Sequence, residues 1–485
     1  MADQLTVIVL AAGGGTRMKS KTMKVLHPIG GRSMIGHVLA AVGGLEPTRV
    51  CAVVGHQREQ VGPHILESLP DAVLAVQEEQ LGTGHAVRIA LEALAAEQAA
   101  ADNGTVLIAY GDTPLLEGRT LRWFAAEHEA AQAAVSILSG VVEAPKGYGR
   151  IVRDDEGDVL AIVEENDASE VQREIREINS GILAFDAGFL AEAILRVGND
   201  NAKGEYYLTD TVQLARDAGL TVTAFPVDDV AQTEGANDRA QLADLGRELN
   251  RRIVTRWMRD GVTVMDPATT WIDADVVLAP DVTILPGTQL LGTTVVAEDA
   301  VIGPDTTLED CEIGAGARVV RTHGQLAVVG DGATVGPFSY LRPGTILGER
   351  GKIGAFVETK NARIGEGAKV PHLSYVGDAE IGEGTNIGAG TIFANYDGVN
   401  KHRTTVGRHA RTASNNTFVA PVTIGDGAGT GAGTVVRRDV PPGALAVNVG
   451  QQRNLEGWAQ EKRPGTAQAQ AAAEASAAAE EQAAT

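Results

Sequence analysis

Cysteine is scarce in this 485-residue chain, which contains only Cys51 and Cys311. Two cysteines without metal-ligand spacing predict neither a disulfide framework nor a cysteine-based metal centre, and they suggest a reducing compartment. Positive charge is also in deficit, because 41 Lys and Arg against 63 Asp and Glu give a formal net charge of −22. This balance argues against a general nucleic-acid-binding protein and against binding to anionic membranes. Any anionic substrate must therefore meet a local island of positive charge.

Long hydrophobic runs are missing as well. The early apolar run at residues 5–12 is too short to span a bilayer, and no basic region precedes it. This run fits a first β-strand better than a targeting or membrane segment. We therefore expect a cytosolic protein without a membrane partner.

From residue 272 onward, the sequence repeats every six residues. One unbroken series consists of Ile272, Leu278, Ile284, Leu290, Val296, Ile302 and Leu308. The same spacing returns in the segments 329–341, 364–376, 381–387 and 406–424. A period of six fits neither a helix nor an ordinary strand, and short fixed repeats indicate a solenoid.

A coil with three flat faces and one hexad per face would place each of these aliphatic residues inside, stacked on adjacent coils. Glycine directly follows several of them, as in Ile302-Gly303, Ile381-Gly382 and Ile424-Gly425, which suits tight corners between faces. An irregular β-sandwich is the alternative, and seven unbroken hexads argue against it.

The first part of the chain, residues 1 to about 228, alternates strand-like and helix-like segments, as in a Rossmann-like α/β domain. The expected strands are 6–10, 50–54, 72–76, 106–110, 133–138 and 182–185. Neither fold implies an activity by itself. Function must therefore come from particular residues that the α/β domain and the repeat domain hold in place.

A linker helix is expected between the two regions. Apolar residues spaced by three or four predict an amphipathic helix over about 238–260; they are Leu242, Leu245, Leu249, Ile253 and Trp257. Asn237-Asp238 supplies an N-cap and Gly261 a stop. We therefore divide the chain into 1–228, a linker at 229–261 and a repeat domain at 262–456. The Ala-, Glu- and Gln-rich remainder, 457–485, has little aliphatic bulk and is predicted to be a disordered tail.

A glycine-rich turn directly follows the first strand and reads Leu10-Ala11-Ala12-Gly13-Gly14-Gly15-Thr16-Arg17-Met18. Glycines let the backbone approach a ligand and aim its N–H groups at anionic oxygens. The turn lacks the Gly-Lys-Ser/Thr ending of a Walker A loop and the third glycine of a dinucleotide fingerprint. A cluster of cations follows instead, formed by Arg17, Lys19, Lys21 and Lys24. For this segment alone, a solvated basic loop is the alternative.

Two further segments predict parts of the same site. Gln77 and the turn Leu81-Gly82-Thr83-Gly84-His85 follow a strand that ends near residue 76. Tyr110-Gly111-Asp112 lies at the carboxyl end of another strand, where open α/β sheets place their ligands. A carboxylate at that place, in a protein that handles phosphate, is a candidate Mg²⁺ ligand. A helix cap is the alternative for Asp112 by itself.

These motifs, together with Lys24-Val25-Leu26-His27, resemble those of sugar-1-phosphate nucleotidyltransferases. With the hexad region, the chain is similar over about residues 5–456 to the family of bifunctional N-acetylglucosamine-1-phosphate uridyltransferases/glucosamine-1-phosphate acetyltransferases (GlmU). The resemblance implies an α/β nucleotidyltransferase domain, a linker helix and a left-handed parallel β-helix that assembles as a homotrimer. It also implies a product, UDP-N-acetylglucosamine, that supplies peptidoglycan and cell-wall synthesis.

For the first site, the resemblance implies in-line attack of the sugar phosphate on the α-phosphorus of UTP, with release of pyrophosphate. Such a reaction needs positioning and charge neutralisation rather than a general base. Arg17 and Lys24 would neutralise the triphosphate, and Asp112 and Asn237 would hold Mg²⁺. The implied UTP- and UDP-sugar-binding residues are Leu10, Ala11, Gly13, Lys24, Gln77, Gly82, Thr83, Tyr110, Asp112, Gly149, Glu164, Asn179 and Asn237.

Within that set, the resemblance assigns the nucleotide to the glycine turn and to Gln77, and the sugar to Gly149, Glu164 and Asn179. One position departs from the family pattern. Met23 stands where the family usually has proline, which would stiffen the loop before Lys24.

Polar residues also cluster between about 342 and 416, where the repeat is interrupted. In a coil of three hexads, residues about 18 apart fall on the same face in successive turns. His372 lies 12 residues from Lys360 and 14 from Asn386, so each pair can lie about one coil apart. For any single member, a surface residue on a loop is the alternative.

For this second site, the resemblance implies acetyl transfer from acetyl-CoA to glucosamine-1-phosphate, with His372 as the general base. The residues implied to bind glucosamine-1-phosphate are Arg342, Lys360, Tyr375 and Asn386. Those implied to bind acetyl-CoA are Ala389, Asn395, Tyr396, Ser414 and Ala432. The segment Thr412-Ala413-Ser414-Asn415-Asn416 departs from the usual Gly-Ser-Asp-Thr of the family.

Two other functions remain open at this point. The first is a single-activity sugar-1-phosphate nucleotidyltransferase whose β-helix is structural or regulatory; it would leave Arg342, Lys360, His372 and Asn386 unexplained. The second is a non-catalytic scaffold, which should have lost Lys24 or Asp112, and this chain retains both.

Overall fold

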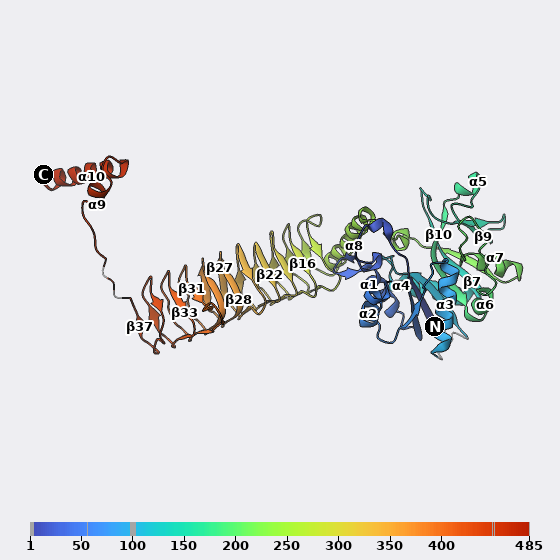
Figure 1. Ribbon diagram of the computed structural model, residues 1–485, viewed down its shortest axis with the longest axis horizontal. Coiled ribbons are helices and arrows are strands. Elements are labelled where there is room, and N and C mark those ends of the chain that lie inside the picture. The colour runs from blue at the N-terminus through green and yellow to red at the C-terminus, as the bar shows by residue number, and fades with distance from the viewer. Residues whose placement is uncertain (1–3, 56, 98–102, 449, 451, 485) are drawn as a thin grey trace. The chain divides into compact units, whose positions relative to one another are not determined.

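The computed structural model describes residues 4–55, 57–97, 103–448, 450 and 452–484. The chain forms two compact units, residues 1–349 and 350–485. The first unit contains the α/β domain, the linker helix and the first coils of the repeat; the second contains further coils and the C-terminal helices (Figure 1).

A nine-stranded sheet forms the centre of the α/β domain, with the main path β11-β7-β10-β6-β1-β4-β5 and a β8–β9 hairpin beside β10. Its strands are β1 (Leu5–Ala11), β4 (Arg49–Val54), β5 (Val73–Val76), β6 (Thr105–Tyr110), β7 (Val135–Val141), β8 (Arg150–Arg153), β9 (Val159–Val163), β10 (Glu177–Asp186) and β11 (Val222–Pro226). The main path is parallel except for β10, which runs antiparallel to both β6 and β7. All six strands expected from the sequence are confirmed, with shifts of a few residues at their ends.

Helices cover both faces of this sheet because the side chains of each strand alternate between its faces. One face packs against α3 (Thr83–Ala96), α6 (Ala187–Ala193) and α7 (Asp210–Asp217). The other packs against α1 (Met34–Gly43), α2 (Arg58–Ser68) and α4 (Gly118–Ala131). In β1, for example, Ile8 faces the first group of helices, whereas Val7 and Val9 face the second. The carboxyl ends of β1 and β6 are thus held side by side in a rigid layer.

The short elements of this domain are η1 (Thr16–Met18), η2 (Lys24–Leu26), β2 (Pro28–Ile29), β3 (Arg32–Ser33), α5 (Glu170–Arg173) and η3 (Val230–Thr233).

The expected linker helix is confirmed as α8 (Arg239–Arg259). Asp238 is its N-cap, and the carboxylate accepts hydrogen bonds of 2.9 Å from the backbone N–H groups of Ala240 and Gln241. Gly261 follows the C-cap with φ 97°, a conformation that favours glycine. The buried Asn250 side chain donates to the Thr270 carbonyl at 2.8 Å and accepts from Ile272 N–H at 3.0 Å, which fixes the helix to the first coil.

The repeat in the first unit is a parallel coil. Trp271 pairs with Gln289 and Gln289 with Thr307, so one turn takes about 18 residues. All seven residues of the unbroken hexad series are between 0 and 5 % exposed, which confirms that the repeat marks the interior. The strands are β12 (Thr263–Val264), β13 (Trp271–Ile272), β14 (Val277–Leu278), β15 (Thr283–Ile284), β16 (Gln289–Leu291), β17 (Val295–Val296), β18 (Val301–Ile302), β19 (Thr307–Glu309), β20 (Glu312–Ile313), β21 (Arg318–Val319), β22 (Thr322–Gln325), β23 (Val328–Val329), β24 (Thr334–Val335), β25 (Ser339–Leu341) and β26 (Ile346–Leu347).

The second unit also consists of parallel coils, but one of them is longer. Lys360 pairs with Gly377, whereas Ala379 pairs with Thr404, because the longer coil includes a loop at residues 395–402. Phe393 and Phe418 fill the interior there, with their rings edge to face at 5.1 Å. The strands are β27 (Lys352–Ala355), β28 (Glu358–Ile364), β29 (Lys369–His372), β30 (Tyr375–Ile381), β31 (Ile392–Ala394), β32 (Thr404–Val406), β33 (Thr417–Val419), β34 (Val422–Ile424), β35 (Gly429–Thr430), β36 (Val435–Val436) and β37 (Leu445–Ala446).

The glycines after the hexad residues serve two purposes, of which the sequence predicted only one. Gly303 has φ 102° and turns a corner, as expected. Gly382 and Gly425 do not have positive φ. A Cβ on Gly382 would lie 2.6 Å from Arg408 N, and one on Gly425 would lie 2.5 Å from Pro442 N. These two glycines therefore allow the next coil to pass closely, and each directly precedes a turn, at residues 383–384 and 426–427.

The C-terminal tail contains two helices, α9 (Trp458–Lys462) and α10 (Ala467–Ala484). The expectation of a disordered segment at 457–485 is corrected, since Ala and Glu have high intrinsic helix propensity. The low aliphatic content still has the predicted effect, because Ala469 alone is buried among the described side chains of this tail. Among the described residues, no helix combines the length and the apolar character needed to cross a membrane.

Candidate functional site

A cavity of about 330 Å³ lies at the carboxyl ends of β1 and β6. It is lined by nine of the residues predicted to bind the nucleotide: Leu10, Ala11, Gly13, Lys24, Gln77, Gly82, Thr83, Tyr110 and Asp112. These residues come from four separate segments of sequence. The α/β topology therefore brings the glycine-rich turns and the strand-end carboxylate together, as their positions in the sequence predicted.

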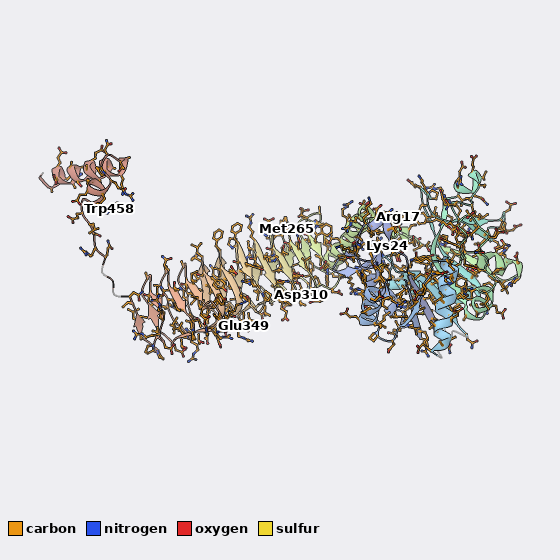
Figure 2. The ribbon with its side chains drawn as sticks, in the orientation of Figure 1. Arg17, Lys24, Met265, Asp310, Glu349 and Trp458 are labelled. Carbon is orange, nitrogen blue, oxygen red and sulfur yellow. The ribbon has the colours of Figure 1, made fainter. Side chains whose placement is uncertain are left out.

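Lys24 forms the electrostatic centre of this cavity. Its Nζ lies 2.5 Å from Asp112 Oδ2 and donates a hydrogen bond of 2.9 Å to Asn237 Oδ1. Asp112 follows β6, and Asn237 precedes α8, so the contact joins three distant parts of the chain. Lys24 is labelled in Figure 2, as is Arg17.

Local backbone geometry sets the position of Lys24. Gly15 has φ 58°, and a Cβ there would clash with the Lys24 side chain. Met23 is buried and has φ −57°, which is already within the range that proline would impose. The departure from the family pattern at Met23 therefore leaves the backbone in the conformation that proline favours.

The oxygen atoms of Asp112 and Asn237 converge on one position, and the Lys24 ammonium occupies it. A hard cation fits such a pair of donors, because Mg²⁺ prefers oxygen ligands and usually takes only one or two from protein carboxylates. Among the described residues, no group of three or more His, Cys, Asp or Glu side chains is placed to hold a metal ion. The Asp112–Asn237 pair thus offers oxygen donors of the kind that suit a hard cation.

The wall of the cavity near the second glycine turn is held by hydrogen bonds. Gln77 is buried, and its Nε2 donates to the Gly82 carbonyl at 3.1 Å. The Thr83 hydroxyl accepts from Leu208 N–H at 3.1 Å. Three further lining residues, Gln80, Ala86 and Glu205, were not predicted from the sequence. Gln80 lies only three positions after Gln77 and could have been suspected, whereas nothing in the sequence marks Glu205.

The three predicted sugar-binding residues form a second group. Asn179 N–H donates to the Gly149 carbonyl at 2.9 Å, and a Cβ on Gly149 would lie 3.4 Å from Glu164 Oε1. Burial raises the pKa of Glu164, although the positive charge of Lys203 opposes this shift. Tyr110 lines the cavity and also lies against this group. A Cβ on Gly181, two residues after Asn179, would overlap the Tyr110 ring. Burial raises the pKa of Tyr110, and the charges of Glu164 and Asp112 add to this effect.

Arg150 lies next to Gly149 in the sequence and was not predicted as part of the site. It is 1 % exposed, pairs with Glu165 at 2.7 Å, and donates to the carbonyls of Tyr148 and Arg173. Arg150 directly follows Gly149 in the sequence, and its ion-pair partner Glu165 directly follows Glu164. A buried, fully bonded guanidinium thus fixes the backbone beside two predicted sugar-binding residues.

Arg17 is exposed and does not line the cavity. Its predicted contact with the triphosphate therefore stays a prediction.

In the second unit, four predicted residues form a ladder along successive coils. Gly390 N–H donates to the His372 carbonyl at 3.2 Å, Asn415 N–H to the Ala389 carbonyl at 2.7 Å, and Gly433 N–H to the Ser414 carbonyl at 3.0 Å. The chain positions brought into line are His372, Ala389, Ser414 and Ala432. The His372 side chain is exposed. The residue predicted as a base therefore lies in register with three residues predicted to bind acetyl-CoA.

A polar group on the adjoining face includes Lys360, Tyr375, Asn395 and Asp378. Asn395 Nδ2 donates to Asp378 Oδ2 at 2.5 Å and lies 3.4 Å from the Tyr375 hydroxyl. Burial raises the pKa of Asp378, but hydrogen bonds from Asn361 and Asn395 and the charges of Lys360 and Lys401 lower it overall. Asp378 could not be predicted from the sequence, because its partners become neighbours only through the coil register.

The other predicted residues lie outside this ladder and group. The backbone of Asn386 forms isolated parallel β-bridges with Lys369 and Arg411 on the adjacent coils. Tyr396 lies in the loop at 395–402, where its hydroxyl donates to the Gly398 carbonyl at 2.6 Å. Arg342 follows β25 in the first unit, and its carbonyl accepts from the Thr345 hydroxyl at 2.7 Å.

Comparison with known proteins identifies the family. Residues 7–175 match the family described as the MobA-like NTP transferase domain. The chain is 59% identical over 466 residues to the "Bifunctional protein GlmU" of Kineococcus radiotolerans, covering 96% of this chain and 94% of the relative. It is 59% identical over 480 residues to the protein of the same name in Rhodococcus jostii (98% and 95%), and 56% identical over 471 residues to that of Corynebacterium jeikeium (96% and 95%).

The chain belongs to the GlmU family. The match extends through both units, so membership includes the hexad region as well as the α/β domain. The fold class and the family expected from the sequence are confirmed.

Proposed function

We propose that this chain is a bifunctional enzyme that makes UDP-N-acetylglucosamine. It transfers an acetyl group from acetyl-CoA to the amine of glucosamine-1-phosphate, and then transfers uridylyl from UTP to N-acetylglucosamine-1-phosphate. The observation that carries this proposal is full-length similarity to proteins named as bifunctional, together with two separate groups of site residues. A single-activity nucleotidyltransferase would leave the His372 ladder without a role.

In the uridylyl-transfer site, the phosphate of the sugar attacks the α-phosphorus of UTP, a phosphorus–oxygen bond to pyrophosphate breaks, and pyrophosphate leaves. Gln77 offers its amide oxygen to the base, since the amide nitrogen is already engaged by Gly82. Lys24 neutralises phosphate charge that builds up during the reaction. Gly149, Glu164 and Asn179 hold the sugar, and Arg17 approaches the triphosphate from the exposed turn.

Asp112 and Asn237 are proposed to hold Mg²⁺, which supplies charge neutralisation and orientation of the phosphates. The proposal rests on the convergence of their two oxygens around the Lys24 ammonium. On this interpretation, Lys24 holds the two residues together before substrate binds and is available to the phosphates afterwards.

In the acetyl-transfer site, the His372 imidazole accepts a proton as the amine of glucosamine-1-phosphate attacks the thioester carbon. The carbon–sulfur bond then breaks, and coenzyme A leaves as a thiolate that takes up a proton. Lys360 and Arg342 bind the sugar phosphate, Tyr375 and Asn386 orient the sugar, and Asn395 and Tyr396 bind acetyl-CoA beside the ladder of Ala389, Ser414 and Ala432. The His372 side chain is exposed, and histidine is the side chain most often used as a general base.

We propose from the family resemblance that the active assembly is a homotrimer. Its proposed role is to supply UDP-N-acetylglucosamine in the cytosol for cell-wall synthesis. Sedimentation showing an active monomer would contradict the trimer.

The experiment that tests the function is a coupled assay with glucosamine-1-phosphate, acetyl-CoA, UTP and Mg²⁺, in which each is omitted in turn. UDP-N-acetylglucosamine should form only with all four present, and N-acetylglucosamine-1-phosphate should replace glucosamine-1-phosphate and acetyl-CoA. Formation of UDP-N-acetylglucosamine from N-acetylglucosamine-1-phosphate, but not from glucosamine-1-phosphate and acetyl-CoA, would support the single-activity alternative.

A further inference from the structure

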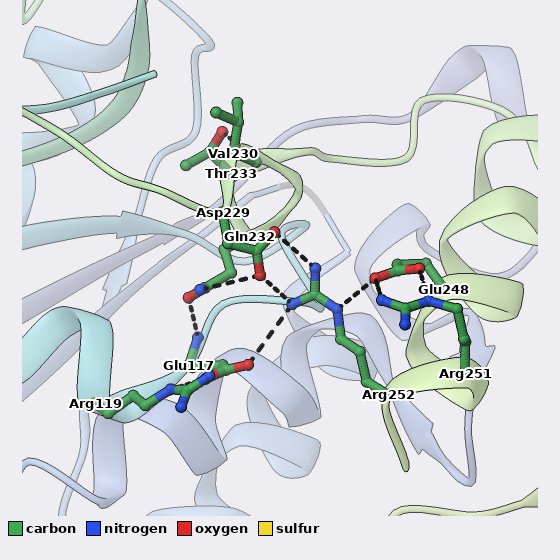
Figure 3. A network of polar contacts seen from close by, with 9 residues as sticks. All are labelled: Glu117, Arg119, Asp229, Val230, Gln232, Thr233, Glu248, Arg251 and Arg252. Carbon is green, nitrogen blue, oxygen red and sulfur yellow. Dashed lines mark hydrogen bonds and ion pairs between the residues drawn. The ribbon is translucent and has the colours of Figure 1, made fainter. Parts of the chain in front are cut away.

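Arg252 is the centre of an ion-pair network on the linker helix α8. Its side chain is 18% exposed and lies 2.9 Å from Asp229, 2.8 Å from Glu248 and 3.6 Å from Glu117 (Figure 3). One guanidinium therefore holds three carboxylates that come from three different segments. The predicted chemistry at Lys24, Asp112 and Asn237 uses none of these residues.

A buried glutamine extends the network between two of those segments. Gln232 is 3% exposed; its Oε1 accepts from Glu117 N–H at 3.2 Å, and its Nε2 donates to Asp229 Oδ2 at 3.4 Å (Figure 3). The start of α4 and the turn η3 are thereby tied to each other as well as to α8.

Both tied segments lead directly to the proposed magnesium ligands. Glu117 lies five residues after Asp112, and Gln232 lies five residues before Asn237. Gly235, which lies between Gln232 and Asn237 in the sequence, packs on Asp112. A Cβ on Gly235 would come within 3.2 Å of the Asp112 carboxyl group. The spacing between Asp112 and Asn237 therefore depends on how these two short segments are held together.

We propose that Arg252 is a positioning residue for the Asp112–Asn237 cation site. By holding Glu117 and Asp229 to α8, it fixes the separation and orientation of the two ligand oxygens. This inference rests on the proposed function of Asp112 and Asn237 as the magnesium pair. Supporting residues around metal ligands typically change metal affinity or activity by about 10–100-fold when they are replaced.

Replacing Arg252 with a neutral residue should also weaken the cation site through repulsion between carboxylates. It would leave Glu117, Asp229 and Glu248 close together, with Arg119 still paired with Glu117 and Arg251 still paired with Glu248. Mutual repulsion would then push the segment after Asp112 away from the one before Asn237. Arg252→Lys keeps the charge but cannot contact three carboxylates with the same geometry, so its effect should be intermediate.

The matched control is Arg251→Gln. Arg251 is adjacent, carries the same charge and pairs with Glu248 at 2.7 Å, but it forms no described ion pair with Glu117 or Asp229. Loss of general electrostatic attraction or of helix stability should affect both variants, whereas loss of positioning should affect only Arg252→Gln.

The test uses the full-length chain and two measurements. The first is binding of Mn²⁺, a paramagnetic substitute for Mg²⁺, followed by the EPR signal of the free ion. The second is the Mg²⁺ concentration that gives half-maximal uridylyl transfer, with acetyl transfer and thermal unfolding as checks that the protein is folded. Arg252→Gln should weaken Mn²⁺ binding and raise the Mg²⁺ requirement by about 10-fold or more, while Arg251→Gln stays within about twofold of wild type.

Asp112→Asn separates failure of this inference from failure of the proposed function. If Asp112→Asn loses Mn²⁺ binding but Arg252→Gln binds Mn²⁺ like wild type, the positioning role is overturned and the metal site stands. If Asp112→Asn binds Mn²⁺ like wild type, the metal site is wrong and the inference falls with it. Should Arg252→Gln fail to fold, Glu117→Gln removes one arm of the network and should shift both measurements in the same direction.

Discussion

The two candidate sites are assembled in different ways. In the first unit, Lys24, Asp112 and Asn237 come from segments up to 213 residues apart and are held together by short contacts between their side chains. In the second unit, His372, Ala389, Ser414 and Ala432 come from consecutive coils and are aligned by the coil register, with the His372 side chain exposed. Long-range packing builds the first site, and local repetition builds the second.

This difference affects how each site should respond to change. In a network of mutual contacts each member orients the others, so the loss of one supporting group should disturb the whole site. A ladder of coils transmits little beyond nearest neighbours, because each repeat contacts only the adjacent ones. The predictions below test that contrast in order of expected effect.

The largest effect is expected for Asp112→Asn. Removing the carboxylate charge takes away one cation ligand and the partner of Lys24, so uridylyl transfer should fall by on the order of 10³-fold or more. Acetyl transfer, measured on the same preparation, should be unchanged. Asp71→Asn, which alters an exposed carboxylate, is the control. Full uridylyl transfer in Asp112→Asn would remove this residue from the site.

His372→Ala should cut acetyl transfer by ~10²–10⁴-fold, the usual cost of losing a general base. Uridylyl transfer should stay at the wild-type rate. His409, another exposed histidine in the second unit, provides the control variant His409→Ala. A parallel loss of both activities in His372→Ala would contradict the independence of the two sites.

Lys24→Met sharpens the description of the first site. Uridylyl transfer should fall by about 10²–10³-fold because a charge that stabilises the transition state is lost. Binding of Mn²⁺ without nucleotide should become tighter, because the ammonium no longer competes for Asp112 and Asn237. Weaker Mn²⁺ binding in this variant would show that Lys24 and the metal do not share a position.

Phe418→Ala tests the second unit through its interior. Phe418 is fully buried against Phe393, so the free energy of unfolding should fall by about 3–5 kcal/mol. Acetyl transfer should lose thermal resistance while uridylyl transfer keeps it. Leu445→Ala, at a residue that is 68% exposed, should change the unfolding free energy by no more than about 0.5 kcal/mol.

The smallest effect concerns the pH dependence of stability at Glu164. Burial raises the pKa of this carboxyl group in the folded protein, so the folded state binds more protons than the unfolded state as pH rises above the ordinary value near 4.5. Folded stability should therefore fall as pH rises through the raised pKa. Glu164→Gln should match wild type in melting temperature near pH 4 and exceed it at pH 8. Glu156→Gln, at an exposed site, should show no such trend.

The sequence was informative wherever the structural signal is local. The hexad residues predicted the interior of the coil because each lies at a fixed spacing, and Asp238 and Gly261 marked the ends of α8 because capping acts within one turn. The strand-end position of Asp112 predicted the cavity, since the carboxyl ends of parallel strands meet at one edge.

The sequence failed where function depends on partners that only tertiary structure brings together. Arg252, Arg150 and Asp378 belong to no motif, and their partners lie on other segments or on adjacent coils. Their importance follows from burial and from the number of polar groups that each contacts. The tail differs from the expectation for the opposite reason, because the local helix propensity of its Ala and Glu residues gives helices even where few side chains are buried.

The most direct test of two independent sites on one chain is a mixing experiment. Asp112→Asn and His372→Ala are assayed separately and together for conversion of glucosamine-1-phosphate, acetyl-CoA and UTP to UDP-N-acetylglucosamine. Each variant alone should fail, and the mixture should form product, because one supplies the acetylated intermediate that the other consumes. A mixture that stays inactive, while each variant retains its remaining single activity, would contradict this account.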